Sequence, residues 1–508
     1  MMTIRLNAFG DLTPRAYDRI VAGEATVAVS DQALARVEAN HQAFLSHIES
    51  GAIVYGTNTG TGALVHTALP REDWLPMQEA VLVNRAGASG PPLAPDVARG
   101  IVLLRLHMAL TAVSAVSADL CRFLVDRVND RMTPWVPGQA LGMDGEMIVQ
   151  SHALTPIIGQ GFVMTEDGGR QPAADWLAAR AITPYRLQMR EGLFLVSGHT
   201  ASWARLRQVR RDVLDTAALL TMTASASIEG MAAMDQHYAA ELEQLMPVPG
   251  LAPVLKAIRA YRAGSAIPTS SFQAPISYRT TPMIHGALLA AVAALDGAMA
   301  GELHSVDDNP LVLGDQSDGL RLFHAGVFHN QHTANLVDGL AVPLTQLGLL
   351  SAHRLHRLLD PAETGLTRQL AARPGMDNGL IILHKAVIGL EPRLKALAAP
   401  FTIHTTESSL GHTDVETMIF PAIDRIAEMC SLLRRFALYE LYTALAAIDQ
   451  RQAKPGERIE AIRRIVRRRI TPYKGPRQLG HDIDVLEEIA AAADFRCLVL
   501  PLEPEPQP

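Results

Sequence analysis

Apolar residues recur with a helical period along most of the chain. Residues 204–245 and 415–451 carry apolar positions at helix spacing with charged residues between them, and no proline interrupts either segment after Pro421. Both are predicted to be long, partly exposed helices. Residues 286–301 and 335–353 are apolar on nearly every face, which predicts helices inside a bundle. The pattern therefore predicts an all-α protein with a central bundle of long helices.

Connectors that contain Gly and Pro separate these helices, at residues 136–146, 268–279 and 305–319. Loops held by a rigid scaffold commonly carry functional side chains, so we expect the chemistry there. Three consecutive parts are expected along the chain. They are a mostly helical N-terminal domain with the active-site loops (1–200), the central long-helix bundle (201–451), and a C-terminal helical segment with a disordered tail (452–508).

Composition and charge narrow the range of partners. The 508 residues are rich in Ala and Leu and have a formal net charge of -7, which argues against a nucleic-acid partner and favours a small molecule. Residues 463–470 are basic, but Glu457, Glu460, Glu487 and Glu488 flank them. We interpret this cluster as a solvated helical face or a subunit contact.

The cysteines and the N-terminus bear on the compartment. Cys121, Cys430 and Cys497 are far apart, which predicts neither a disulfide framework nor a zinc ribbon. The first residues lack a basic region followed by an apolar stretch, and no uninterrupted apolar run reaches the roughly 18 residues that a membrane span needs. The sequence therefore predicts a cytoplasmic protein without a membrane partner.

A series of motifs carries a resemblance to a known family. The segment VYGTNTGTG (54–62) contains a tyrosine at the mouth of a Gly-rich loop. Six further segments follow in order, namely RAGASGPPL (85–93), REGLFLVSGHT (190–200), FQAPISYR (272–279), SVDDNPLV (305–312), FHNQHTANLVDGLA (328–341) and the register 378–418. In these segments the chain resembles the histidine and phenylalanine ammonia-lyases over about residues 50–450. The resemblance implies a mostly helical fold with a central bundle, and a homotetramer whose active sites draw residues from more than one subunit.

The chain departs from this family where the family makes its electrophile. The family cyclises an Ala-Ser-Gly tripeptide to a methylidene-imidazolone, whereas this chain has Met143-Asp144-Gly145 at that place. An aspartate cannot supply the alkene that dehydration of the serine provides, so no such prosthetic group and no other cofactor is expected. The tripeptide Ala88-Ser89-Gly90 lies well upstream of the cyclising loop, and we interpret it as a turn.

Two family residues implicated in catalysis are retained. Tyr55 matches the tyrosine at the mouth of the family's Gly-rich loop and is our candidate for the general base, and Arg279 matches the arginine that holds the substrate carboxylate. A planar guanidinium suits a carboxylate, although a structural salt bridge is the alternative for Arg279. Because a free phenol is mostly protonated at neutral pH, Tyr55 requires cationic neighbours such as Arg85 and Arg279.

Other family positions have changed. The family's second tyrosine is Ile276, with Tyr278 nearby, and the asparagine of the Asn-Gly-Thr segment is Ser197. The histidine that contacts the ring in histidine ammonia-lyases is Arg85, and the acidic residue that shares this task is Thr413. The predicted substrate-binding residues are Arg85, Asp144, Ser197, Asn309, Phe328, His412 and Thr413.

These departures suit an elimination whose leaving group needs no covalent activation. A quaternary ammonium already carries its charge and leaves as neutral trimethylamine. Asp144 would offset that charge and Phe328 would add a cation-π contact, although Asp144 as a helix N-cap is the alternative. The resemblance is then to the ergothioneine trimethylamine-lyases, with thiourocanate as product, because Arg85 and His412 can donate hydrogen bonds to a thione.

Three alternatives remain open at this point. The substrate is another betaine such as hercynine, or an amino acid processed without the usual prosthetic group. In a second reading the protein is a non-catalytic relative that binds a small molecule. In a third, His324, His329 and His332 belong to a metal hydrolase, but the H-E-x-x-H motif is missing, so no metal site is expected.

Overall fold

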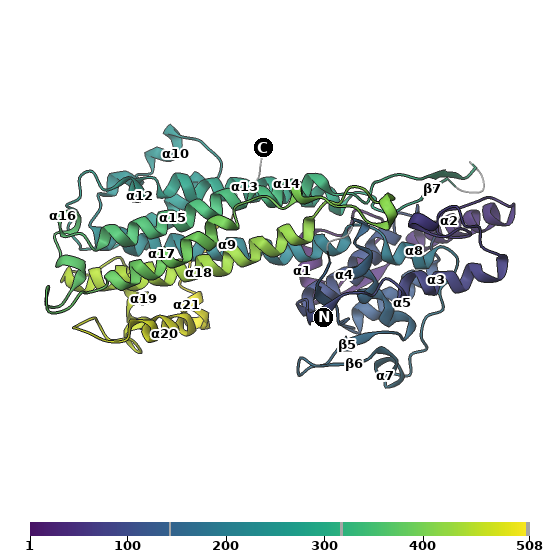
Figure 1. Cartoon of the computed structure of the whole chain (residues 1–508), viewed down its shortest axis with the longest axis horizontal. Helices are drawn as coiled ribbons and strands as arrows, with labels where there is room; N and C mark the ends of the chain where they lie inside the picture. Colours follow the sequence, from purple (N-terminus) through teal and green to yellow (C-terminus); the bar gives the residue numbers. More distant parts are fainter. Residues whose placement is uncertain (142–143, 315–318, 504–508) are drawn as a thin grey trace. The chain divides into compact units, whose positions relative to one another are not determined.

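The computed structural model describes residues 1–141, 144–314 and 319–503, and these form a mostly helical protein (Figure 1). Within this part of the chain, strands form only four two-stranded sheets. Strands β1 and β2 pair in parallel, and the other three pairs are antiparallel. The all-α fold predicted from the periodicity is confirmed. Residue Met143, which belongs to the altered tripeptide, lies outside the described residues, as do residues 504–508 of the predicted disordered tail.

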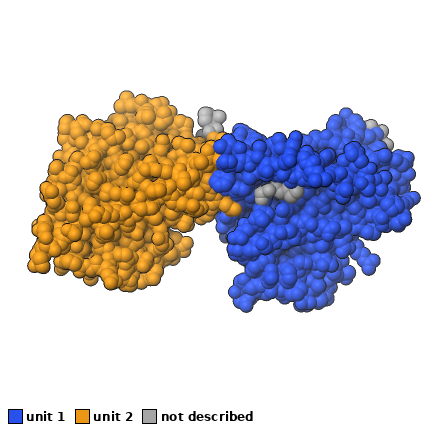
Figure 2. Space-filling view, viewed as in Figure 1, with its two compact units in different colours: residues 1–208, 298–335, 401–422 blue, residues 209–297, 336–400, 423–508 orange. Residues whose placement is uncertain are grey.

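The chain divides into two compact units, coloured separately in Figure 2. Unit 1 contains residues 1–208, 298–335 and 401–422, and unit 2 contains residues 209–297, 336–400 and 423–508. Each unit is therefore built from three separate stretches of sequence, whereas the sequence suggested three consecutive parts.

The elements of unit 1, with η denoting 3-10 helices, are β1 (Met2–Leu6), α1 (Pro14–Val21), β2 (Ala25–Val29), α2 (Asp31–Glu49), η1 (Gly62–Leu64), η2 (Arg71–Asp73), α3 (Trp74–Val83), β3 (Ser89–Pro92), α4 (Pro95–Ala109), α5 (Ala118–Asn129), β4 (Pro137–Gln139), η3 (Asp144–Glu146), α6 (Met147–Leu154), η4 (Thr155–Ile158), β5 (Phe162–Met164), β6 (Arg170–Pro172), α7 (Ala173–Ala178), α8 (Glu191–Val196), β7 (Leu311–Leu313), β8 (Arg321–Phe323), η7 (Thr402–His404) and η8 (Ser409–Gly411). Those of unit 2 are η5 (Asp235–Tyr238), α10 (Glu241–Leu245), α11 (Leu251–Arg262), α12 (Ile276–Arg279), α15 (Ala341–Leu358), α16 (Pro361–Thr364), η6 (Arg368–Leu370), α17 (Ile381–Ala396), α19 (Glu457–Arg467), α20 (Leu479–Ala491) and α21 (Ala493–Arg496). Helices with residues in both units are α9 (Thr200–Met231), α13 (Thr281–Leu303), α14 (Gln331–Gly339) and α18 (Ile419–Gln450).

Long helices form the body of unit 2 and run along a common direction in Figure 1. A buried polar network joins them. The Arg354 guanidinium of α15 donates to both carboxylate oxygens of Glu440 in α18, at 2.6 and 2.9 Å, and to the Thr281 hydroxyl of α13 at 3.2 Å. Ser227 of α9 also donates to Glu440, at 2.6 Å. Since Arg354 and Glu440 are fully buried, this network fixes the bundle at its centre.

Two predicted helices end differently in the structure. The segment 204–245 forms a single helix only as far as Met231, because Ala232 takes a positive φ of 56° that breaks the helical ladder. The segment 335–353 is divided between α14 and α15 around Leu340. Pro343 explains the division, because it has no N–H to donate to the carbonyl of Gly339 four residues earlier.

The basic cluster of unit 2 and the apolar helix α13 bear on the predicted partners. Arginines of the basic cluster are paired with carboxylates, since Arg463 and Arg467 bind Asp449 at 3.0 and 2.7 Å, and Arg469 binds Glu488 at 2.6 Å. Helix α13 is long and apolar enough to cross a membrane by length and composition alone, a test that the core helix of a soluble protein also passes.

Candidate active site

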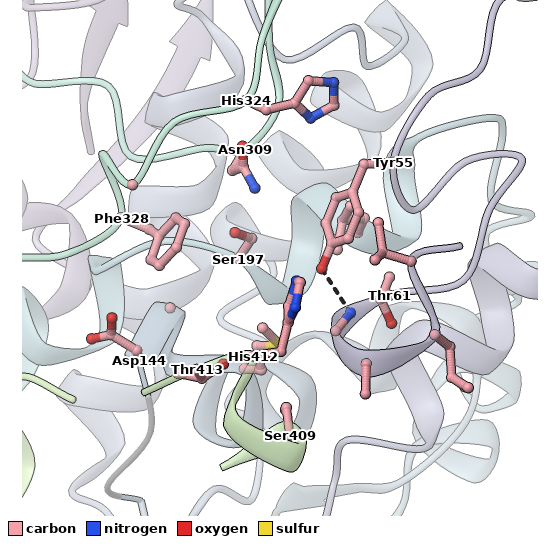
Figure 3. A pocket seen from close by; sticks show the side chains of 18 of the residues that line it. Tyr55, Thr61, Asp144, Ser197, Asn309, His324, Phe328, Ser409, His412 and Thr413 are labelled. Carbon is pink, nitrogen blue, oxygen red and sulfur yellow. Dashed lines mark hydrogen bonds between the residues drawn. The ribbon is translucent and has the colours of Figure 1, made fainter. Parts of the chain in front are cut away.

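A cavity of about 1080 Å³ opens in unit 1, lined by loops and helix ends from separate parts of the chain. Figure 3 shows Tyr55 and Thr61 on one side of it, with Phe328 and Asp144 on the other. The segments that line it fall within residues 53–66, 84–85, 144–147, 193–197, 309–329 and 409–415. Most of the connectors in which the sequence placed the chemistry therefore meet at this pocket.

The Tyr55 loop is rigid because its own side chains close it. Asn58 accepts the N–H of Val54 at 2.7 Å and donates to the carbonyl of Ala52 at 2.7 Å, as expected of an asparagine in a turn. Gly56 has a φ of +63°, and a Cβ there would lie only 2.3 Å from the Leu193 side chain. The positive φ therefore favours glycine at position 56, and a Cβ there would displace the Leu193 side chain.

The phenolic oxygen of Tyr55 faces the first turn of η1. It accepts the backbone N–H of Gly62 at 3.0 Å, the contact drawn as a dashed line in Figure 3. The ring meets His324 edge-on, with 6.4 Å between the ring centroids. The Gly62 N–H therefore fixes the position of the phenolic oxygen in the pocket wall.

Arg85 follows α3 and lies on the same wall as Tyr55. Its guanidinium donates to the Thr61 hydroxyl at 2.6 Å, to the carbonyl of Val81 at 2.9 Å and to the Met147 sulfur at 3.2 Å. Burial lowers the pKa of Arg85, and the negative charge of an ionised Tyr55 would raise it again. The guanidinium therefore lies within electrostatic reach of the Tyr55 phenol.

Asp144 is a buried carboxylic acid in the pocket wall, with 6% of its surface exposed. Its backbone N–H donates to Glu416, and its Oδ2 lies 3.6 Å from Nε2 of His329. The other oxygen, Oδ1, is buried without a hydrogen-bond partner. Burial and then the negative charge of Glu416 raise the pKa of Asp144 to about 7, against an opposing contribution from the Thr417 backbone N–H.

The turn that carries Asp144 is fastened to the start of α9. Gly145, with a φ of 69°, accepts the N–H of Gly198 at 3.1 Å. The Glu146 carboxylate accepts the N–H groups of Ala201 and Ser202 at 2.7 and 2.9 Å, which caps the first turn of α9. Helix α6 begins at Met147 with Glu146 as its N-cap residue and no side-chain cap bond. The alternative that Asp144 caps α6 therefore has no hydrogen bond in the structure to support it.

The remaining predicted residues complete the wall. The Phe328 ring packs over Gly145, 3.7 Å from where a Cβ there would lie. Asn309 is held in place because its Oδ1 accepts the N–H of Ala325 at 3.0 Å. His412 and Thr413 follow η8, in a loop that paired Ser408 and Thr413 backbone bonds close at 2.7 and 3.3 Å.

The structure brings eight of the nine predicted site residues to this one pocket, namely Tyr55, Arg85, Asp144, Ser197, Asn309, Phe328, His412 and Thr413. The ninth, Arg279, does not line it. Arg279 ends α12 in unit 2, where its Nε donates to the carbonyl of Ala274 at 2.8 Å. Ile276, at the family's second tyrosine position, is 60% exposed. Tyr278 is fully buried and donates to the carbonyl of Arg354.

Sequence reasoning missed several residues of the site. Glu416 lies within the register that carried the resemblance, but nothing in its spacing shows that it accepts the Asp144 N–H. Thr61 belongs to the Tyr55 motif and holds Arg85, which the motif alone does not reveal. His324 and His329 were considered only as metal ligands, yet both line the pocket.

Comparison with known proteins shows the family. The family model described as aromatic amino acid lyase matches residues 12–468. The chain belongs to the aromatic amino acid lyase family. It is therefore a lyase that acts on a small molecule, and the family resemblance drawn from its motifs is confirmed.

One relative and two solved structures illustrate the similarity. The histidine ammonia-lyase of Sorangium cellulosum (strain So ce56) is 30% identical over 482 residues, covering 92% of each chain. Ergothionase from Treponema denticola, solved with desmethyl-ergothioneine sulfonic acid, has a TM-score of 0.91 at 22% identity and covers 97% of this chain and 99% of its own. Tyrosine aminomutase from Streptomyces globisporus has a TM-score of 0.87 at 23% identity, with 99% and 100% covered. The two structures show that the ammonia-lyase fold extends over nearly the whole chain.

One other interpretation changes at this point. Ser89 begins the strand β3 and pairs with Gln139 of β4, so the Ala88-Ser89-Gly90 segment enters a short sheet and is not the simple turn that we expected. Among the described residues, no group of three or more His, Cys, Asp or Glu is arranged to hold a metal ion. His332 does not join His324 and His329 in the pocket wall.

Proposed function

We propose that this lyase eliminates trimethylamine from an aromatic amino-acid betaine, with ergothioneine as the preferred substrate and thiourocanate as the product. The observation that supports this most directly is the Asp144 carboxyl group. It lines the pocket, is buried, and has an oxygen without a hydrogen-bond partner. Such a group calls for a cation in the pocket, because an ionised carboxylate is costly to bury unpaired.

The residues of the Asp144 turn do not fit the family's prosthetic group. Residues 143–145 read Met-Asp-Gly, and the middle residue supplies a carboxyl group in place of the serine hydroxyl that is lost as water. Asp144 also retains a free side-chain oxygen and a backbone N–H donated to Glu416. The reaction therefore has to proceed without an electrophile made from this tripeptide.

A trimethylammonium group removes the need for that electrophile. It carries a permanent positive charge, has no lone pair with which to attack, and departs as a neutral amine. Asp144 offers it a counter-charge, and Phe328 beside Gly145 offers an aromatic face. Histidine, whose amine is a poor leaving group until it is activated, gains nothing from this arrangement.

Tyr55, which would remove the substrate proton, lies on the side of the pocket opposite Asp144 and Phe328 (Figure 3). Tyr55, ionised, takes a proton from the carbon next to the ring, the electrons of that C–H bond form the new double bond, and the C–N bond breaks to release trimethylamine. Arg85 stabilises the phenolate through its charge, and the Gly62 N–H does so through its hydrogen bond. Proton abstraction and departure of the amine thus occur at adjacent carbons of the substrate, with Tyr55 and Asp144 on opposite sides of the pocket (Figure 3).

The carboxylate clamp requires a second chain. Arg279 does not line the pocket of its own chain, and the exposed Ile276 lies on the same short helix. We propose a homotetramer in the cytoplasm, in which Arg279 of one subunit binds the substrate carboxylate in the pocket of another. A charge-assisted pair of this kind contributes about 1.5–3 kcal/mol.

Ring recognition favours a thione. Arg85 and His412 both line the pocket and offer N–H donors of the kind that suits a polarised sulfur. Ser197, Asn309 and Thr413 surround the space between Asp144 and Tyr55 and supply further polar contacts. The solved structure of ergothionase is that of a protein whose ligand is an ergothioneine derivative, which agrees with this choice.

The test uses purified protein without added cofactor, incubated separately with ergothioneine, hercynine and histidine. Release of trimethylamine and ammonia is measured together with the ultraviolet absorbance of the conjugated acrylate. Trimethylamine from ergothioneine supports the proposal, whereas release from hercynine alone moves the preference to the ring without sulfur. Ammonia from histidine, or no reaction with any of the three, contradicts it.

A further inference from the structure

Asp144 does not act alone in the pocket wall, because Glu416 is bonded to its backbone. The Glu416 carboxylate accepts the Asp144 N–H with one oxygen and the Ser408 hydroxyl with the other, at 3.2 Å. Glu416 is 3% exposed and does not line the pocket. The Glu416 carboxylate is therefore held against the backbone of Asp144, whose own carboxyl group lines the pocket.

No strong positive charge compensates this pair among the groups that face it. The basic side chains in the pocket wall are His66, Arg85, His324, His329 and His412, and the other acidic one is Asp414. Of these, His329 lies 3.6 Å from Asp144, but burial lowers its pKa, which keeps the imidazole neutral near pH 7. Arg85 is engaged with Thr61 and Met147. Glu146, two residues along, is directed to Ala201 and Ser202.

We infer that Asp144 and Glu416 act as one carboxyl pair, which holds a proton while the pocket is empty and releases it to solvent when a quaternary ammonium binds. Two adjacent carboxylates resist full ionisation, and a bound cation removes that resistance. Burial raises the pKa of both groups, that of Asp144 to about 7. In this scheme Asp144 touches the ammonium, and Glu416 is a positioning residue that acts through it.

The inference rests on the proposed function for its choice of ligand and makes a separate prediction about pH. Because the raised pKa falls when the cation binds, affinity for the cation is highest above pH 7 and declines as the pH falls through that value. With a pKa near 7, about half a proton is released per site at pH 7 and almost none at pH 9. A pocket whose Asp144 is always ionised shows no release at either pH.

Calorimetric titration measures this release directly, since the heat of binding then depends on the ionisation enthalpy of the buffer. The Tyr55→Phe variant is titrated with ergothioneine in phosphate and in HEPES at pH 7, and in borate and in Tris at pH 9, so that binding is seen without turnover. Thiourocanate, which lacks the ammonium, serves as the control ligand. Release with ergothioneine at pH 7 only, and none with thiourocanate, is the expected result.

A second substitution tests whether the released proton depends on the charge of Glu416. Glu416→Gln keeps an oxygen that accepts the Asp144 N–H but removes the charge, so release at pH 7 should fall at least threefold. Glu407→Gln makes the same chemical change at an exposed site of the same loop and should leave release unaltered. Equal release from both variants overturns the inference. If Glu416→Gln does not fold, the absence of release at pH 7 in the Tyr55→Phe protein overturns the inference.

Failure of the proposed function leads to a different result. Trimethylamine formed from ergothioneine without any proton release rejects the pair and keeps the lyase. If ergothioneine neither binds nor reacts, tetramethylammonium chloride is added to the unbuffered wild-type protein, with sodium chloride as the reference. Proton release by tetramethylammonium alone, lost in Glu416→Gln, supports the pair without the proposed substrate, and its absence rejects the pair.

Discussion

The phenolic oxygen of Tyr55 is the atom on which the proposed proton transfer depends. Tyr55→Phe removes this oxygen and leaves the ring, so only the Gly62 N–H loses its partner. We expect turnover of ergothioneine to fall by about 10²–10⁴-fold, the usual contribution of a positioned acid or base. Trimethylamine release measures the effect, and unchanged circular dichroism excludes a folding defect. Tyr473→Phe, in unit 2, is the matched control and should keep full activity.

The Asp144 carboxyl group is tested by a neutral replacement of the same shape. Asp144→Asn removes the counter-charge for the trimethylammonium, which should raise KM for ergothioneine by about 10–100-fold, or about 1.5–3 kcal/mol. Inhibition by thiourocanate should change little because that molecule has no cation. Steady-state kinetics with product inhibition separate the two effects. An equal loss of affinity for both molecules would show that Asp144 shapes the pocket and does not bind the cation.

Single residues of the site could be predicted where the family motif extends to them. Tyr55, Arg85 and Thr413 all reach the same pocket, as the ordered motifs implied. Glu416 could not be found in this way, because its hydrogen bond reaches Asp144 across 272 positions of sequence. Arg279 keeps its motif, yet its guanidinium donates to the carbonyl of Ala274 and does not line the pocket of its own chain. Periodicity and spacing describe neighbours along a helix and contain no information about such distant contacts.

Among the helices of unit 2, the buried pair Arg354–Glu440 offers a test of stability. Arg354→Met leaves the Glu440 carboxylate buried without its cation, which should lower the free energy of unfolding by about 3–5 kcal/mol. Replacing both partners with apolar residues, Arg354→Met with Glu440→Leu, should recover much of this loss because no charge then remains buried. Chemical denaturation of the three proteins measures the difference. A double variant no more stable than the single one would show that the hydrogen bonds lost by Ser227 and Thr281 outweigh the removal of the buried charge.

Glu146 connects the Asp144 turn to the start of α9 and should make stability depend on pH. Burial raises its pKa to about 8, although the N–H groups of Ala201 and Ser202 oppose this. The folded pKa is above the unfolded one near 4.5, so the stabilisation is complete below pH 4.5 and is lost as pH rises towards 8. Glu146→Gln should therefore flatten the loss of stability between pH 5 and pH 8, which is on the order of a few kcal/mol. Thermal unfolding of both proteins across this range is the measurement. A parallel decline in the two would mean that another group titrates.

The long helices show how far apolar periodicity reaches. Segment 415–451 corresponds closely to α18, Ile419–Gln450, because Pro421 is tolerated in the first turn of a helix. Segment 204–245 was extended too far, since residues beyond Met231 keep apolar positions but form η5 and α10. The periodicity detects the buried stripe of a helix, whereas a break depends on backbone conformation, here a positive φ at Ala232. The ends of these helices were therefore less predictable than their existence.

In the assembled protein, each active site is proposed to combine Tyr55 of one subunit with Arg279 of another, and this can be tested with mixed tetramers. Tyr55 lies in the pocket of unit 1, and Arg279 is proposed to reach the pocket of a neighbouring subunit. Tyr55→Phe and Arg279→Met should each strongly reduce turnover when made alone. In tetramers formed by co-expressing the two variants, a pocket with an intact Tyr55 meets an intact Arg279 from another chain in about a quarter of cases at random mixing.

Recovery to about a quarter of wild-type activity is therefore expected from the mixed tetramers, since each restored pocket is complete. Sedimentation of the mixed protein verifies the tetramer, and differently tagged chains show that both variants are present. Mixing the tetramers after separate purification is the control, because chains that do not exchange should stay inactive. If co-expressed tetramers also stay inactive, Tyr55 and Arg279 act from the same chain or Arg279 does not bind the carboxylate. Binding of thiourocanate to Arg279→Met separates these two cases, because only a lost carboxylate clamp weakens it.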